Sequence, residues 1–420
     1  MAPPDGSRRH VRDQHSASGT YRWAVLVAAT VAQASSSLPM QGLGVLAEQF
    51  RADLGLNDAQ IGLMVTVAGA APILALFAVG HLLDRYDERF IVGAGSLISA
   101  AGVALAAAFR LYLLVLVGLF IFGLGYSTAQ PGGSKLVAEW FPRRQRGTAM
   151  GIRQAGLPIG GALAALALPA AARHGEWQLG LWIAAIVVLA GGLVFVVFYR
   201  RAPHMPPASP RQPLLPRIAG QLRQPAMPPI ILTGFTLVGT QYAVTTYFVL
   251  FTRDRWHTPI ATAASMYFAA QLAGAIGRIA LAAASDRPGL TRLSWVRLCM
   301  LATAVLAATL PFLPARADAI EFTAAALLGF VSYGWYGPWV AHVTETGAAD
   351  STGLRLGSAM AVNQIAIVGA PPLLGLLADV AGYPTMWWAI TLVLITFSLL
   401  ARPRAVRPSG DLLSDHPEGY

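Results

Sequence analysis

Long apolar stretches, separated by short polar ones, run through most of the chain. Each stretch has about twenty residues, the length at which an α-helix crosses the hydrocarbon core of a bilayer. The pattern predicts twelve membrane-spanning helices, at about residues 23–44, 60–80, 91–108, 111–138, 147–171, 178–200, 229–252, 260–283, 294–313, 319–343, 355–378 and 383–401. Helices are expected because a backbone that crosses lipid must satisfy its own hydrogen bonds.

An internal repeat divides this series of helices into two equal parts. Residues 147–156 return in altered form as residues 357–366, an offset of 210 in a chain of 420. Each copy follows a charged loop and begins a long apolar helix. A repeat of this kind is typical of secondary transporters built from two similar halves. One position differs in chemistry, because Arg153 in the first copy corresponds to Asn363 in the second.

The repeat predicts an all-α membrane protein with two pseudo-symmetric six-helix bundles. We expect an N-terminal tail at 1–22, the first bundle at 23–200, a central loop at 201–228, the second bundle at 229–401 and a C-terminal tail at 402–420. Arg200 precedes the central loop, which carries four further arginines among many prolines, and this composition predicts an irregular linker.

Charged residues make up only 12% of the chain and apolar residues 55%, although the net charge is +10. Of the 30 basic residues, 21 fall in the tails and loops on one side of the predicted membrane and six on the other. Positive residues concentrate on the cytoplasmic side, so we expect both termini in the cytoplasm and the chain in the inner membrane. The excess of positive charge is thereby explained by topology, and no nucleic-acid partner is expected.

The loop after the second predicted span reads GHLLDRYDER at residues 80–89, and residues 282–287 read AAASDR. The first stretch resembles the G-x-L-x-D-R-x-G-R-[RK] loop motif of the major facilitator superfamily at Gly80, Leu82, Asp84, Arg85 and Arg89, with Asp87 in place of the usual glycine, and the other is a degenerate copy. With twelve spans and a long central loop, the chain resembles the organic-anion and monocarboxylate branches of that family. The resemblance implies a carrier that works as a monomer in the lipid bilayer. It also implies a gating role for Asp84, Arg85, Arg89, Asp286 and Arg287.

Three cations lie inside predicted spans: Lys135, Arg153 and Arg278. A charge at the bilayer centre costs about 2.5 kcal/mol or more, so we expect each of these side chains either to pair with another group or to serve transport. Lys135 has Glu139 one helical turn away and lies near a helix end. Arg278 lies about 12 Å deeper than Asp286 at the helical rise per residue. Arginine after glycine at this place resembles monocarboxylate and oxalate-type carriers, in which it holds the substrate carboxylate; the alternative is a structural pair with Asp286.

No acidic residue lies near the middle of a predicted span. Positive charge without buried acids favours an anionic ligand, because arginine binds carboxylates with two parallel hydrogen bonds. The predicted substrate-binding set combines the two deep arginines with polar residues on spans 1, 4, 7, 10 and 11: Arg278, Arg153, Gln33, Gln130, Gln241, Tyr242, Tyr336, Asn363 and Gln364. If protons drive transport, His342 is a candidate carrier.

These features predict a secondary transporter that moves a small organic anion, a carboxylate, by alternating access, with proton symport as the expected driving force. The alternative is a drug or metabolite exporter of the same fold, because residues 156–161 resemble the G-P-x-x-G-G motif of drug antiporters with the proline displaced by one. We expect no enzyme, no catalytic residues and no metal or other cofactor. The spans contain no cluster of His, Asp and Glu, and no G-x-x-x-x-G-K-[ST] motif is present.

Overall fold

The computed structural model describes residues 6–141, 143–174, 176–200, 214–315, 318–346 and 352–401. Within these ranges, some side chains, including those of residues 6–20, Asp84 and Lys135, lie outside the description. The described residues are almost entirely α-helical, and no β-strand occurs among them. The predicted all-α fold is therefore confirmed.

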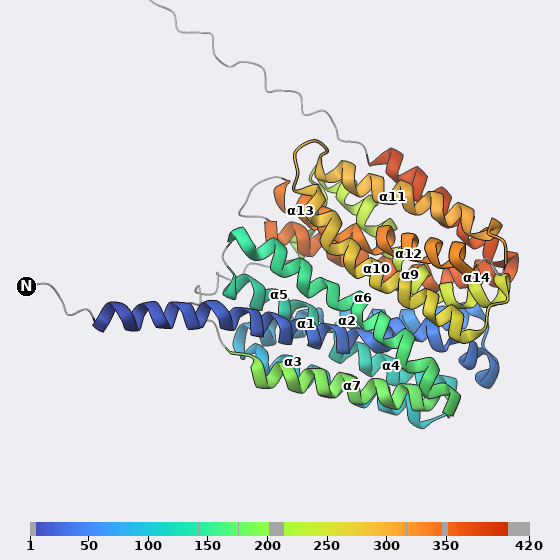
Figure 1. Cartoon of the computed structure of the whole chain (residues 1–420), viewed down its shortest axis with the longest axis horizontal. Coiled ribbons are helices and arrows are strands. Elements are labelled where there is room, and N and C mark those ends of the chain that lie inside the picture. Colours follow the sequence, from blue (N-terminus) through green and yellow to red (C-terminus); the bar gives the residue numbers. More distant parts are fainter. Residues whose placement is uncertain are drawn as a thin grey trace, which may run out of the picture.

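Among the described residues, seven helices form the first half of the chain. They are α1 (Gly6–Leu54), α2 (Asp58–Arg85), α3 (Glu88–Ala108), α4 (Tyr112–Tyr126), α5 (Ala129–Trp140), α6 (Arg143–His174) and α7 (Trp177–Phe198). The helices of the second half are α8 (Leu214–Leu222), α9 (Met227–Trp256), α10 (Ile260–Ser285), α11 (Arg292–Thr309), the short 3-10 helix η1 (Leu310–Phe312), α12 (Asp318–Gly334), α13 (Tyr336–Glu345) and α14 (Thr352–Leu400). Figure 1 shows the two halves as adjoining bundles, one in blue to green and the other in yellow to red.

Each of the twelve predicted spans is helical, although their number differs from the number of helices. The last two spans follow each other directly within α14, although Gly382 turns the chain between them with a φ of 80° and a ψ of 163°. Eight of the described helices are long and apolar enough to cross a membrane. Two of the predicted spans are split into shorter pieces, and these pieces fall below that length.

The fourth span of each half is broken at a similar place. In the first half the break lies at Ser127 and Thr128, between α4 and α5, and in the second half at Trp335, between α12 and α13. Each break comes three or four residues before a proline, Pro131 or Pro338. Proline has no amide hydrogen and cannot continue the helical hydrogen-bond ladder. The two breaks therefore follow from the chain's own sequence in both halves.

The prediction of an irregular central loop is wrong over residues 214–222, which form α8. Its leucines and isoleucine recur at Leu214, Ile218 and Leu222, a spacing that places them on one side of a helix. Leu222 packs against the hydrophobic core of the bundle, and α8 contacts α9 and α14. Packing against the bundle thus stabilises a helix in a segment whose arginines and prolines led us to predict an irregular loop.

Alternating helix directions define two ends of the bundle. At the end that we call the terminal face, α1 begins, α7 ends and the loops after α2, α5, α10 and α13 lie; there Tyr21 donates a hydrogen bond to Phe198 O and Trp140 donates to Arg200 O. The opposite end, the distal face, holds the end of α1 and the starts of α2, α4, α7, α10 and α12. Figure 1 shows α1 running from one end to the other.

Gly382 gives a first test of the fold. A backbone with φ near 80° and ψ near 160° is essentially restricted to glycine, and another residue there costs about 1–3 kcal/mol. We expect Gly382→Ala to lower the unfolding temperature of the purified protein by a few degrees in a thermal melt. Gly369→Ala is the matched control, because Gly369 is helical with no atom within 4 Å of an added Cβ. An equal loss in both variants would contradict the assignment.

Candidate functional site

Arg278 lies on α10 with its guanidinium group between the two halves. Its side chain is 3% exposed. Nη1 donates to the Gln154 carbonyl on α6 at 3.0 Å, and Nη2 donates to Gln241 Oε1 on α9 at 3.4 Å. Its Cζ lies 5.1 Å from the centre of the Tyr336 ring. No Asp or Glu in the described part of the chain forms an ion pair with Arg278.

Two glycines set the position of this arginine. A Cβ added at Gly277 would lie 2.3 Å from Phe330 O, and one at Gly274 would lie 2.9 Å from Tyr333 Cβ. Hence α10 packs backbone to backbone on α12, as small residues allow. With that side of α10 held against α12, the next residue along, Arg278, points toward α6 and α9.

Arg153 on α6 is fully buried. Its Nη2 lies 3.0 Å from Gln33 Oε1 on α1. The same nitrogen lies 2.9 Å from three oxygens on α5: the carbonyl oxygens of Ala129 and Gln130, and Gln130 Oε1. A Cβ at Gly133 would lie 2.2 Å from Arg153 Nε. The break before α5 brings the first turn of that helix to the guanidinium group. Arg153 thereby ties α1, α5 and α6 together within the first half.

Gln154 connects the two arginines. Its carbonyl accepts from Arg278, and its Nε2 donates to Tyr336 Oη at 3.1 Å. Tyr126 and Tyr336 both lie near Arg153 and Arg278. We define the arginine cluster as Gln33, Tyr126, Gln130, Arg153, Gln154, Gln241, Arg278 and Tyr336. Its members come from both halves, so a relative movement of the halves changes its geometry.

The cluster joins most of the predicted substrate-binding residues but not all of them. Tyr242 is buried and interacts electrostatically with Arg278, so it lies at the edge of the cluster. Asn363 is buried near Gly234, a glycine that also lies against Trp339. Gln364 donates to Gly69 O at 2.7 Å and joins α14 to α2. The contacts of Asn363 and Gln364 are therefore different from those of the arginine cluster.

Two members of the cluster, Tyr126 and Gln154, were absent from the predicted set. Gln154 follows Arg153 directly within the repeated block, so its place in the repeat was a usable signal. Tyr126 is the last residue of α4, immediately before the break, and lies near both arginines.

The predicted gating residues at the terminal face show no bond between the halves in the described structure. Arg85, Arg89 and Arg287 are exposed, whereas the Asp84 side chain lies outside the described residues. Asp286 pairs with Arg292 at 2.7 Å, and Arg292 also pairs with Glu345 at 3.0 Å. This ion-pair network connects α10, α11 and α13 of the same half.

His342 lies in a separate open pocket at the terminal face. The pocket is lined by Ser285, Leu290, Thr291, Arg292, His342, Glu345 and Thr346. Thr346 Oγ1 lies 3.5 Å from His342 Nδ1, a long contact for a hydrogen bond. No three His, Cys, Asp or Glu side chains that could hold a metal ion gather among the residues that were described.

Comparison with known proteins gives the same picture of the fold. Residues 26–366 match the model of the Major Facilitator Superfamily. An uncharacterized MFS-type transporter of Mycobacterium tuberculosis (strain CDC 1551 / Oshkosh) is 30% identical over 382 residues, covering 87% of this chain and 81% of the relative. The 3-(3-hydroxy-phenyl)propionate transporter of Escherichia coli (strain K12) is 33% identical over 154 residues, 36% of this chain and 38% of the relative.

Among solved structures, a bacterial homolog of the human lysosomal transporter Spinster, in an inward-facing and occupied conformation, has a TM-score of 0.72. The identity is 16%, and the match covers 91% of this chain and 97% of the other. At that identity the likeness concerns the fold, which is the twelve-helix arrangement predicted from the apolar pattern.

Proposed function

Because the chain belongs to the major facilitator superfamily and is a membrane transporter, we propose that it moves a small organic anion, a carboxylate, through the arginine cluster. The binding residues are Arg278 and Arg153, with Gln33, Gln130, Gln241, Tyr242 and Tyr336 shaping the site around them. Tyr126 and Gln154 complete this proposed site. Gln364 belongs to the interface between the halves, and Asn363 to contacts within the second half, rather than to the substrate contacts.

The observation that carries this proposal is the unbalanced charge of Arg278. The guanidinium group is buried, and its partners in the described residues are neutral: a carbonyl, an amide oxygen and an aromatic ring. Removing a cation from water costs several kcal/mol unless an opposite charge compensates it. A ligand carboxylate supplies that charge and replaces the two weak acceptors with two charge-assisted hydrogen bonds.

The surroundings of Arg278 favour a carboxylate with an apolar or aromatic body. Tyr336 presents a ring face to the guanidinium group, and Tyr242 and Tyr126 are within its electrostatic reach. Tyrosine offers an apolar face and a polar tip, which suits an aromatic acid. The similarity to the 3-(3-hydroxy-phenyl)propionate transporter of Escherichia coli supports this class of substrate.

Alternating access follows from the position of the cluster between the halves. Among the described residues, hydrogen bonds between halves occur at the distal face and at the level of the cluster, as with Gln154 and Tyr336. We propose that the terminal face is cytoplasmic and that the membrane is the inner membrane, as the excess of arginine at that face predicts. We further propose that the carrier works as a monomer and that protons drive uptake, with His342, an acid at a helix end or the substrate itself as proton carrier.

Matched pairs of carboxylates and their amides test the substrate class. We expect 3-phenylpropionate and benzoate to raise the unfolding temperature of the detergent-purified protein, and their amides to leave it unchanged. A ligand at ten times its Kd stabilises the folded state by about 1.4 kcal/mol. The amides keep the size and the ring but lack the charge, so they isolate the contribution of the arginines.

The alternative exporter function makes the opposite prediction in the same experiment. If cationic or neutral drugs stabilise the protein and carboxylates do no better than their amides, the anion proposal is wrong. Simple inorganic anions belong in the same screen, because stabilisation by chloride or sulfate alone would indicate a charge site without specificity for a carboxylate.

A further inference from the structure

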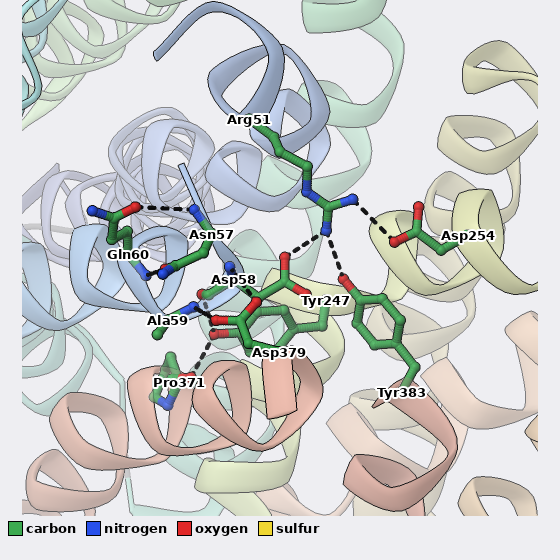
Figure 2. Close-up of polar contacts among 10 residues, drawn as sticks. All are labelled: Arg51, Asn57, Asp58, Ala59, Gln60, Tyr247, Asp254, Pro371, Asp379 and Tyr383. Atoms are coloured by element: carbon green, nitrogen blue, oxygen red, sulfur yellow. Dashed lines mark hydrogen bonds and ion pairs between the residues drawn. The ribbon is translucent and has the colours of Figure 1, made fainter. Parts of the chain in front are cut away.

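A network of polar contacts joins the two halves at the distal face, and Arg51 at the end of α1 is its centre (Figure 2). Its Nη2 pairs with Asp58 Oδ1 at 2.5 Å and donates to Tyr383 Oη at 3.1 Å, while its Nη1 pairs with Asp254 Oδ2 at 3.0 Å. Asp58 belongs to the same half as Arg51. Asp254 on α9 and Tyr383 on α14 belong to the other half, so one guanidinium group joins α2 of its own half to two elements across the interface.

A second link across the same face is made by Asp379 on α14. Its two carboxylate oxygens accept from the backbone N–H groups of Asp58 and Ala59, each at 2.9 Å. These N–H groups begin α2, where the helix dipole favours a negative charge. Asn57 already caps the same helix within its own half through a hydrogen bond from Gln60 N. Asp379 therefore acts as a second cap supplied by the opposite half, as Figure 2 shows.

Close backbone packing surrounds these charges. Tyr247 on α9 donates to both Pro371 O on α14 and Asp58 O on α2. A Cβ added at Gly375 would lie 2.4 Å from Asp58 O, and one at Gly62 would lie 2.4 Å from Tyr247 Oη. A further ion pair connects Arg253 of one half with Glu48 of the other. Thus α1 and α2 of one half lie in close contact with α9 and α14 of the other around these charges.

We propose that Arg51, Asp58, Asp254, Asp379 and Tyr383 form a lock that holds the distal face closed and must break each time the carrier opens there. The five side chains are defined from here on as the distal lock. When the halves part, Arg51 loses Asp254 and Tyr383, and two N–H groups of α2 lose a carboxylate. The lock deepens the proposed function by assigning gating residues to the face opposite the family's loop motif, and its role in a transport cycle rests on that function.

The two faces differ in how their charges are paired, and this difference supports a lock rather than general stability. At the terminal face, Arg292 pairs with Asp286 and Glu345 inside one half. At the distal face, Arg110 pairs with Glu176 inside the other half. Contacts of that kind survive a rigid-body movement of the halves, whereas every cross-half bond of the distal lock is lost. Charge-assisted contacts of this type shift a two-state equilibrium by about tenfold or more when one is removed.

Distances between spin labels on the ligand-free protein test the lock directly. Cys299 is the chain's single cysteine and is buried, so Cys299→Ala gives a clean background. Asp53→Cys at the end of α1 and Arg255→Cys near the end of α9 place one exposed label on each half at the distal face. Electron paramagnetic resonance then gives the distance distribution in lipid nanodiscs for the unaltered lock and for Asp379→Asn and Arg51→Gln.

We expect a short distance to dominate when the lock is intact, and a longer, distal-open distance to grow about tenfold in population in both lock variants. Arg110→Gln is the matched control, because it breaks an ion pair on the same face within one half and should leave the distribution unchanged. Tyr383→Phe removes one acceptor of Arg51 with little risk to folding, and an intermediate shift is expected.

The lock proposal is overturned if Asp379→Asn, Arg51→Gln and Tyr383→Phe all keep the short distance, or if Arg110→Gln opens the face equally. A thermal melt of each labelled variant confirms that it is folded before the distances are compared. No ligand is present, so failure here leaves carboxylate binding untouched. Loss of the carboxylate response in the thermal screen would likewise leave the measured distances standing.

Discussion

Replacing Arg278 by glutamine is expected to lower transport of the best-binding carboxylate at least about a hundredfold. Hydrogen bonds to a charged group contribute about 1.5–3 kcal/mol each, and the loss of two of them exceeds the 2.8 kcal/mol that corresponds to a hundredfold change in affinity. Glutamine keeps a polar side chain but supplies no positive charge to the ligand. Uptake into proteoliposomes and the thermal shift with the same carboxylate measure the effect.

The same variant is expected to be at least as stable as the wild type when no ligand is present. Arg278 is a buried cation with neutral partners in the described structure, and such a charge destabilises the fold that contains it. A loss of activity with unchanged or higher unfolding temperature is typical of a residue kept for function. A large loss of stability would indicate a structural role instead.

Arg297→Gln is the control for this prediction. Arg297 is another arginine of the second half, and its Nε donates to Ser398 O at 2.9 Å. It lies on α11, outside the arginine cluster, and its replacement should keep both transport and the carboxylate response. Arg278→Lys tests geometry, because a lysine keeps the charge but loses the planar fork that grips a carboxylate at two points. If Arg278→Gln transports normally, the proposed site is wrong.

A leucine in place of Gly44 is expected to abolish transport by keeping the distal face open. A Cβ at this position would lie 2.1 Å from Thr245 O and 2.9 Å from Thr246 Cα. Both are backbone atoms of α9, so neither can rotate away as a side chain does. Excess volume in a packed contact costs about 1–3 kcal/mol, and more where backbone must move. Here the halves can avoid the clash by staying apart at this face.

Two measurements test this prediction: the distance between the spin labels at positions 53 and 255, and uptake into proteoliposomes. In Gly44→Leu we expect the long distance to dominate and uptake to fall to the level of empty liposomes, with a folded, monodisperse protein. Gly151→Leu is the matched control, because no atom lies within 4 Å of a Cβ at Gly151. A Gly44→Leu protein that keeps the short distal distance and normal uptake would contradict the close approach of α1 and α9.

The apolar pattern was sufficient to predict twelve spans and two halves, because crossing lipid requires a long, apolar, hydrogen-bonded helix. The deep charges of Arg153 and Arg278 could be recognised for the same reason, since arginine is rare inside such helices. The broken fourth span of each half was missed, although Pro131 and Pro338 mark both breaks. The helix α8 was missed because its amphipathic spacing was short and its surroundings were rich in proline and arginine.

The sequence was a poorer guide to which residues contact one another in space. The predicted site joined Asn363 and Gln364 to Arg153 and Arg278 because all lie at polar positions of inward-facing helices. In the structure Gln364 bonds to Gly69 across the halves, and Gln154, next to Arg153 in the chain, bonds to Arg278 and Tyr336. The predicted gate concentrated on the loop motif at the terminal face. In the described structure, bonds between the halves, including those of Arg51, Arg253 and Asp379, lie at the opposite, distal face.

By itself, then, the sequence determined the membrane location, the number of spans, the two-fold repeat and the presence of costly buried cations, because these depend on local composition and on the solvent that each segment faces. The tertiary structure alone decided which side chains share a site and which hold the halves together. Arg51 and Tyr383 are 332 residues apart along the chain and 3.1 Å apart in space. Such a pairing depends on how rigid helices pack against one another, and no local pattern in the sequence records it.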